Sequence, residues 1–72
     1  MNALYKQIRD SYEKYGFAEV VPVDNVYAIK MITSKRGKTP VFGYASYSDR
    51  EPLVWLDADN AWSFLADALD GL

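Results

Sequence analysis

The spacing of hydrophobic and polar positions divides this chain into helical and extended segments. In residues 3–15 the apolar side chains recur every three or four positions, which is the period of an amphipathic helix. The stripe consists of Leu4, Ile8, Tyr12 and Tyr15. Asn2 can cap the first turn, and Gly16 can supply the left-handed residue that ends many helices. We therefore expect a helix over residues 3–15.

A β-hairpin with a basic tip is predicted in the middle of the chain. Residues 26–34 and 39–48 are rich in β-branched and aromatic side chains, which favour strands. The connection between them consists of Lys35, Arg36, Gly37 and Lys38. Because glycine adopts a positive φ without strain, Gly37 suits a tight hairpin loop. We expect this hairpin at the centre of an antiparallel sheet.

Two further extended segments flank the hairpin. Residues 17–23 contain Pro22, which has no backbone N–H to donate to a neighbouring strand. This segment should therefore lie at an edge of the sheet. Residues 53–56 follow a turn that contains Pro52, and they predict a short fourth strand.

A second helix is expected over residues 58–70. Asp57 is its predicted N-cap, and Asp59 in the first turn favours the positive end of the helix dipole. The predicted buried stripe is Ala58, Ala61, Trp62, Leu65, Ala68, Leu69 and Leu72. Phe64 lies off that stripe, so we expect it to be exposed. Gly71 is placed to end the helix.

The predicted order is α-β-β-β-β-α in a single domain of 72 residues. Two helices of this length can cover only one face of a four-stranded sheet. The expected fold class is therefore α+β, a two-layer sandwich with an antiparallel meander and both helices on one face. The other face would meet solvent or a partner. The pattern leaves the strand order open.

Alternation along the strands assigns side chains to the two faces. Phe42 and Tyr44 are expected on the open face, because Gly43 and Ala45 are small enough for a helix to pack closely above them. The pattern does not decide which face Trp55 occupies. On the open face its ring would form a platform of three rings with Phe42 and Tyr44.

The same alternation on the preceding strand places Lys30 on the open face. Tyr27, Ile29 and Met31 then point toward the core.

The aromatic content exceeds what such a small interior can hide. The chain has two Trp, six Tyr and three Phe residues, so some rings should form a surface cluster, which is a reason to expect a partner. It has no cysteine and no histidine, so disulfides, cysteine-based zinc sites and the commonest general base are excluded.

Catalysis has little support in these residues. The paired carboxylates are Asp57 with Asp59 and Asp49 with Glu51, and Asp57 is better explained as a helix cap. No calcium loop, phosphate-binding glycine loop or nucleophile elbow is present. We expect no enzyme activity, no cofactor and no metal site.

Charge is distributed unevenly along the chain. The net charge is −2, and residues 1–48 hold seven Lys or Arg against four Asp or Glu, whereas residues 49–72 hold one against six. The acidic group expected to bind a partner is Asp49, Glu51, Asp67 and Asp70. It is interpreted either as a solvated helix surface or as a face for a basic protein partner.

One strand resembles a nucleic-acid-binding motif. Residues 42–47, Phe-Gly-Tyr-Ala-Ser-Tyr, resemble the aromatic strand of RNA-recognition-motif domains, whose rings stack on bases. That family has a strand before its first helix, whereas this chain begins with the helix. The helix–strands–helix order is also similar to the double-stranded-RNA-binding domain, but Asp57 and Asp59 stand where that family places lysines.

These resemblances imply an alternative function in RNA or single-stranded nucleic-acid binding. It would use the basic loop together with the two exposed rings, that is Lys30, Lys35, Arg36, Lys38, Phe42 and Tyr44. A sequence pI of about 4.8 opposes it, because such affinity depends on neutralising phosphates.

The favoured expectation is a non-enzymatic module that binds a protein partner through Phe42, Tyr44 and Trp55 together with the acidic group. The chain is similar in type to small proteins of phages and mobile elements that inhibit nucleic-acid-handling proteins of the host, such as anti-CRISPR proteins, or neutralise toxins. A homodimer is the other protein partner considered. The N-terminus lacks the apolar core of a signal peptide and no apolar run could span a membrane, so a cytoplasmic location is expected.

Overall fold

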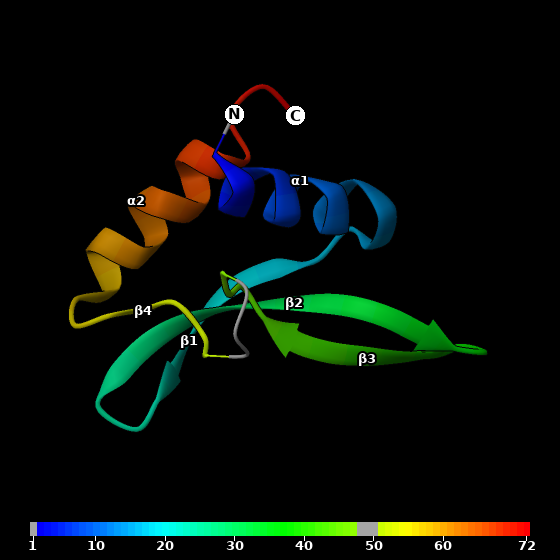
Figure 1. The fold of residues 1–72 in the computed structure, drawn as a ribbon, viewed down its shortest axis with the longest axis horizontal. Helices are drawn as coiled ribbons and strands as arrows, with labels where there is room; N and C mark the ends of the chain where they lie inside the picture. The colour runs from blue at the N-terminus through cyan, green and yellow to red at the C-terminus, as the bar shows by residue number, and fades with distance from the viewer. Residues whose placement is uncertain (1, 48–50) are drawn as a thin grey trace.

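Two helices lie on one side of a four-stranded antiparallel sheet (Figure 1). The computed structural model describes residues 2–47 and 51–72. The elements in chain order are α1 (Ala3–Tyr15), β1 (Ala18–Val23), β2 (Val26–Arg36), β3 (Thr39–Tyr44), β4 (Val54–Trp55) and α2 (Ala58–Ala68). The expected α+β sandwich with α-β-β-β-β-α order is therefore confirmed.

Helix α1 begins and ends where the sequence pattern predicts. The Asn2 side chain accepts a hydrogen bond from the backbone N–H of Leu4 at 2.8 Å. At the other end, Gly16 has a φ of 72°, and its N–H donates to the carbonyl oxygen of Tyr12 at 2.7 Å. Both groups satisfy backbone polar atoms that a helix end leaves unpaired.

The β2–β3 hairpin forms as expected, but only β2 is central, because β3 lies at an edge of the sheet. Arg36 pairs with Thr39 across the loop, and Gly37 adopts a φ of 62°. The register shifts between Ile32 and Ser34, so Thr33 is the extra residue of a β-bulge. Strand β1 pairs only with β2 among the described residues, which is consistent with an edge position for Pro22.

The fourth strand corrects the expected meander, because β4 pairs with β2 instead of β3. Beyond β3, Ala45 still donates its N–H to Ile29, and its carbonyl oxygen accepts from Leu53. Strand β4 then continues along the same edge of β2, with Val54 opposite Ala28. Two strands thus share one edge of the long strand β2.

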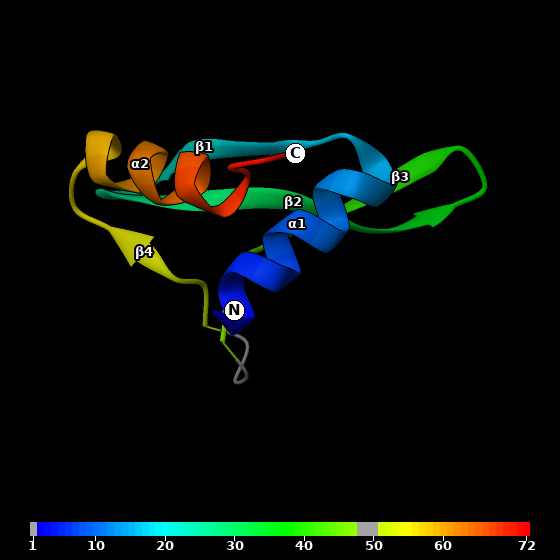
Figure 2. The same cartoon turned by 90° about the horizontal axis from the view of Figure 1, so that it is seen from above.

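The core lies between the helices and the sheet, and α1 crosses the strands at an angle (Figure 2). Residues on the helix side of β2, Ile29 and Met31, are buried, as the alternation predicts. They contact small and branched side chains from both helices. The buried cluster is Leu4, Ile8, Ile29, Met31, Ala45, Leu65 and Ala68.

Helix α2 is rotated relative to the predicted stripe. Trp62 was expected to be buried and is 50% exposed, and Leu72 is exposed as well. Phe64 was expected to be exposed, but its ring packs against Tyr5 and Trp55, with centroid separations of 4.9 and 5.1 Å. Contacts with other elements explain this difference, because the rings of Tyr5 on α1 and Trp55 on β4 favour burial of Phe64.

Candidate binding surface

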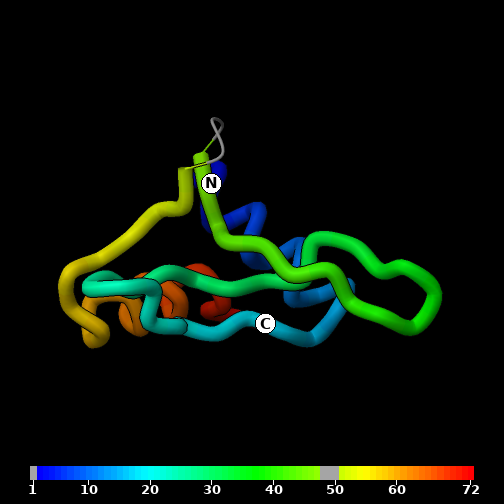
Figure 3. The backbone as a smooth tube through the Cα atoms, turned by 90° about the horizontal axis from the view of Figure 1, so that it is seen from below, coloured from blue at the N-terminus to red at the C-terminus, as the bar shows by residue number. Residues whose placement is uncertain are grey.

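The sheet has one face that no helix covers, here called the open face (Figure 3). Seen from this side, the strands lie in front of both helices. The register places Lys30 beside Glu19 on β1 and Tyr44 on β3, and it places Ile32 beside Phe42. The predicted assignment of Phe42, Tyr44 and Lys30 to this face is therefore correct.

Apolar side chains extend across the open face in successive rows of paired residues. Val21 and Val54 flank Ala28, and Val23 lies opposite Val26. Glu19 and Lys30 are charged residues that share this face with them, and Lys35, which pairs with Pro40, lies on the same side nearer the loop. The open-face residues are Phe17, Glu19, Val21, Val23, Val26, Ala28, Lys30, Ile32, Phe42, Tyr44 and Val54.

The rings of the open face partly shield the sheet beneath them. Phe17 and Phe42 meet edge to face with centroids 5.4 Å apart, and Ile32 in the same row is buried. The Lys30 ammonium lies 4.4 Å from the centre of the Phe42 ring, a cation–π contact. Phe42 is nevertheless 45% exposed and Tyr44 42% exposed. The shielding is incomplete, and an apolar surface faces outward.

The end of this surface near β4 is also apolar. Val54 is exposed, and Leu56, two residues further on, is 86% exposed. A leucine side chain left in water forgoes about 1.5–3 kcal/mol of burial free energy. The sequence analysis did not single out Phe17, Val21, Val54 or Leu56. The alternation of apolar and polar residues along residues 17–23 was the available signal.

Trp55 does not join the platform of exposed rings. It pairs with Tyr27, which is on the helix side, and its ring is packed against Phe64 and the core. The three-ring platform is therefore reduced to Phe42 and Tyr44, supplemented by Phe17.

The predicted acidic group comes from separate parts of the chain. Asp49 lies outside the described residues. Asp67 on α2 and Asp70 just beyond it are exposed, and so is Glu51, which precedes β4. The grouping of these carboxylates into one binding surface stays a prediction.

The basic loop projects beyond α1 at one end of the molecule (Figure 1). Lys35, Arg36 and Lys38, here called the basic tip, are all exposed. The fourth cation of the alternative nucleic-acid site, Lys30, is half-buried on the open face. Its ammonium occupies one side of the Phe42 ring, on which a base would otherwise stack.

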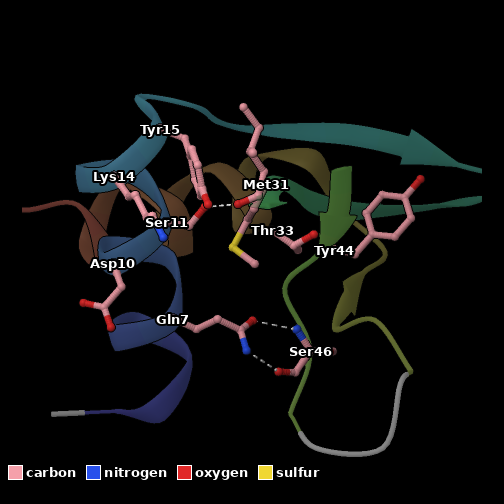
Figure 4. Close-up of a pocket in the computed structure, with 10 residues that line it drawn as sticks. Gln7, Asp10, Ser11, Lys14, Tyr15, Met31, Thr33, Tyr44 and Ser46 are labelled. Carbon is pink, nitrogen blue, oxygen red and sulfur yellow. Dashed lines mark hydrogen bonds between the residues drawn. The ribbon is translucent and has the colours of Figure 1, made fainter. Parts of the chain in front are cut away.

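A shallow groove of about 430 Å³ separates α1 from β2 and β3 (Figure 4). Its polar side chains are mostly bonded to the protein itself. The Gln7 amide exchanges two hydrogen bonds with the backbone of Ser46, and the Ser11 hydroxyl donates to Ile32 at 2.7 Å. These bonds fasten α1 to the sheet.

One charged side chain of the groove, Asp10, is paired with a neighbour on α1. The Lys6 ammonium lies 2.7 Å from an Asp10 carboxylate oxygen, and this hydrogen bond raises the pKa of Lys6 above its ordinary value. Within residues 2–47 and 51–72, no three acidic side chains gather in a way that could hold a metal ion. None of the helices in the same ranges has the length and apolar character to cross a membrane.

The fold and this surface define a class: a two-layer α+β domain with an uncovered apolar sheet face. Comparisons with protein-family models, with curated proteins and with solved structures found no match for the chain.

Proposed function

We propose that this chain is a non-enzymatic protein-binding module and that the open face is its binding surface. The observation that carries the proposal is the continuity of apolar side chains across the open face, from Phe17 and Phe42 to Val21 and Val54. Exposed apolar patches of this kind are typical of protein interfaces. The cation–π pair of Lys30 and Phe42 supplies a polar element within it.

The inhibitor role expected from the sequence stays a prediction. We rest the proposal on the open face rather than on the acidic residues, because Glu51, Asp67 and Asp70 come from different segments and Asp49 lies outside the described residues. A partner anchored by apolar rings needs no basic surface of its own.

The proposal is tested with the double substitution Phe42→Ser/Tyr44→Ser. Both side chains are about half exposed, so the fold should survive, which circular dichroism and a thermal melt would check. Capture of a partner protein from a lysate of the encoding organism should be lost. The matched control is Trp62→Ser, which removes a ring of similar exposure from the helix layer and should leave capture intact. Equal capture by the wild type and the double variant would refute the proposal.

Nucleic-acid binding is the second candidate, favoured by the exposure of Lys35, Arg36 and Lys38 on a projecting loop. A gel-shift assay with single-stranded RNA and duplex DNA at ~0.15 M salt distinguishes the two, since phosphate contacts dominate such binding. We expect only weak non-specific binding. A nanomolar complex that is lost on Lys35→Ala/Lys38→Ala would favour the second candidate.

A further inference from the structure

We propose that the partner of the open face is a second copy of this chain, packed face to face with its strands antiparallel to those of the first copy. This inference rests on the proposed function, because it names the occupant of the same surface. Three features of the molecule carry it: the apolar side chains on both sides of β2, the charges at the two ends of the long axis, and the total exposed area.

Strand β2 carries apolar side chains on both sides, with Lys30 as a charged residue between Ala28 and Ile32 on the open side. Ile29 and Met31 contact the helices, whereas Ala28 and Ile32 on the open side are equally buried under their neighbours. A strand whose side chains are apolar on both faces is typical of sheets that are covered on both faces. The helices supply one cover, and the chain has no further element for the other side among the described residues.

Opposite charges lie at the two ends of the sheet. The basic tip occupies one end (Figure 1). At the other end lie the β1–β2 turn with Asp24 and the start of α2 with Asp57 and Asp59, here called the carboxylate end. All six side chains are exposed. The one ion pair found in residues 2–47 and 51–72 joins Lys6 and Asp10, so neither end is neutralised within the chain.

This arrangement is complementary to itself in one orientation. When a two-fold axis runs across the strands between the two faces, the basic tip of each copy lies near the carboxylate end of the other. The alternative axis along the strands would bring the two basic tips together, and like charges would repel. The charges thus select the antiparallel arrangement.

The open face carries charges of both signs. Glu19 and Lys30 are cross-strand neighbours, and Lys35 lies nearer the tip on the same side. A uniformly acidic or uniformly basic partner surface would match only one sign of these charges. The whole-chain accessible surface, 5017 Å², is about a tenth larger than the ~4,500 Å² typical of a monomer of this mass.

The first test is sedimentation velocity on the full chain over a range of concentrations. A reversible monomer–dimer equilibrium is expected. Phe42→Ser/Tyr44→Ser should raise the dissociation constant at least about tenfold, since central rings dominate such interfaces. The matched control, Trp62→Ser, should leave it unchanged. A monomer at all concentrations would overturn the inference; if Phe42→Ser/Tyr44→Ser still abolished capture of another protein, the proposed function would survive.

The orientation is tested by cross-linking, which the absence of native cysteine makes specific. Lys35→Cys lies in the basic tip, and Asn25→Cys lies in the β1–β2 turn at the carboxylate end. With a short bismaleimide, a mixture of the two variants should cross-link far more than either variant alone. Efficient cross-linking of Lys35→Cys with itself would show the parallel arrangement and refute the proposed one.

Salt provides a check on the charge argument. Between ~0.1 M and ~1 M NaCl the Debye length falls from ~10 Å to ~3 Å, so the end-to-end attraction is screened. The dimer should weaken in high salt. A dimer that tightens with salt would be held by apolar contacts alone, and the selection of an antiparallel arrangement by charge would then be wrong.

Discussion

At the scale of single residues, Gly43 is small because of a neighbouring strand rather than because of a helix. A Cβ atom at this position would come within 2.8 Å of the Thr33 Cγ2 methyl group. Thr33 is the bulged residue of β2, and its hydroxyl donates to the Val41 carbonyl oxygen at 3.2 Å. The expectation that a helix packs above both Gly43 and Ala45 therefore holds for Ala45, which is in the core, and needs this correction for Gly43.

Gly43→Ala should destabilise the protein by about 1–2 kcal/mol, because the new methyl group overlaps a branched side chain held by a hydrogen bond. Chemical denaturation measures the change. Thr33→Ser removes the clashing methyl group and keeps the hydroxyl. Gly43→Ala should therefore cost much less stability in the Thr33→Ser background than in the wild type. An equal cost in both backgrounds would place the strain elsewhere.

At the scale of elements, helix α2 is held in its orientation by contacts in its second half and at its C-terminus. Past its midpoint, Phe64 is packed between Tyr5 and Trp55. At its C-terminus, the Arg9 guanidinium of α1 donates to the carbonyl oxygens of Ala68 at 3.2 Å and Asp70 at 2.7 Å. A cation at this position satisfies unpaired carbonyls and favours the negative end of the helix dipole. These contacts connect α2 to α1 in the helix layer and to β4 in the sheet.

The rotation of α2 predicts an order of mutational effects. Phe64→Ala should cost about 2–3 kcal/mol, below the range for fully buried rings because Phe64 is half-buried. Trp62→Ala should cost under about 1 kcal/mol, since half of this larger ring already faces water. Urea denaturation of both variants compares them directly. The reverse order would mean that the helix sits as its sequence periodicity alone suggests.

At the scale of the whole molecule, β2 is the axis of the fold. It pairs with β1 on one edge, and with β3 and β4 on the other. Residues 26–31 of β2 therefore pair with β1 on one edge, and most of them also have β3 or β4 as a neighbour on the other edge. The basic tip, in contrast, extends past α1 and has no layer above it (Figure 2).

This difference predicts a gradient of amide hydrogen exchange along one strand. Amides of Ala28 to Met31 should exchange only through global unfolding, whereas those of Lys35 to Lys38 should exchange through local opening with little protection. NMR-detected exchange resolves the two groups. Uniform protection from the centre of β2 to its tip would contradict the fold described.

Much of the candidate surface could be predicted from alternation alone. Phe42, Tyr44 and Lys30 were assigned correctly. Side chains alternate between the two faces of a strand, so once one residue is assigned to a face the others on that strand follow. Trp55 could not be assigned, since a two-residue strand has almost no period and its face depends on pairing with Tyr27. The acidic residues were grouped by their nearness in sequence, which does not determine nearness in space.

The sequence by itself determined the elements and their class. Caps at Asn2, Gly16 and Asp57, a glycine in the hairpin loop, and two clear periodicities are local signals that act within a few residues. Only the tertiary structure decided that β4 returns to β2, that α2 turns Phe64 inward, and that the two charged ends lie apart on one sheet. These features depend on contacts between distant segments, and no local pattern encodes which of several compatible partners packs best.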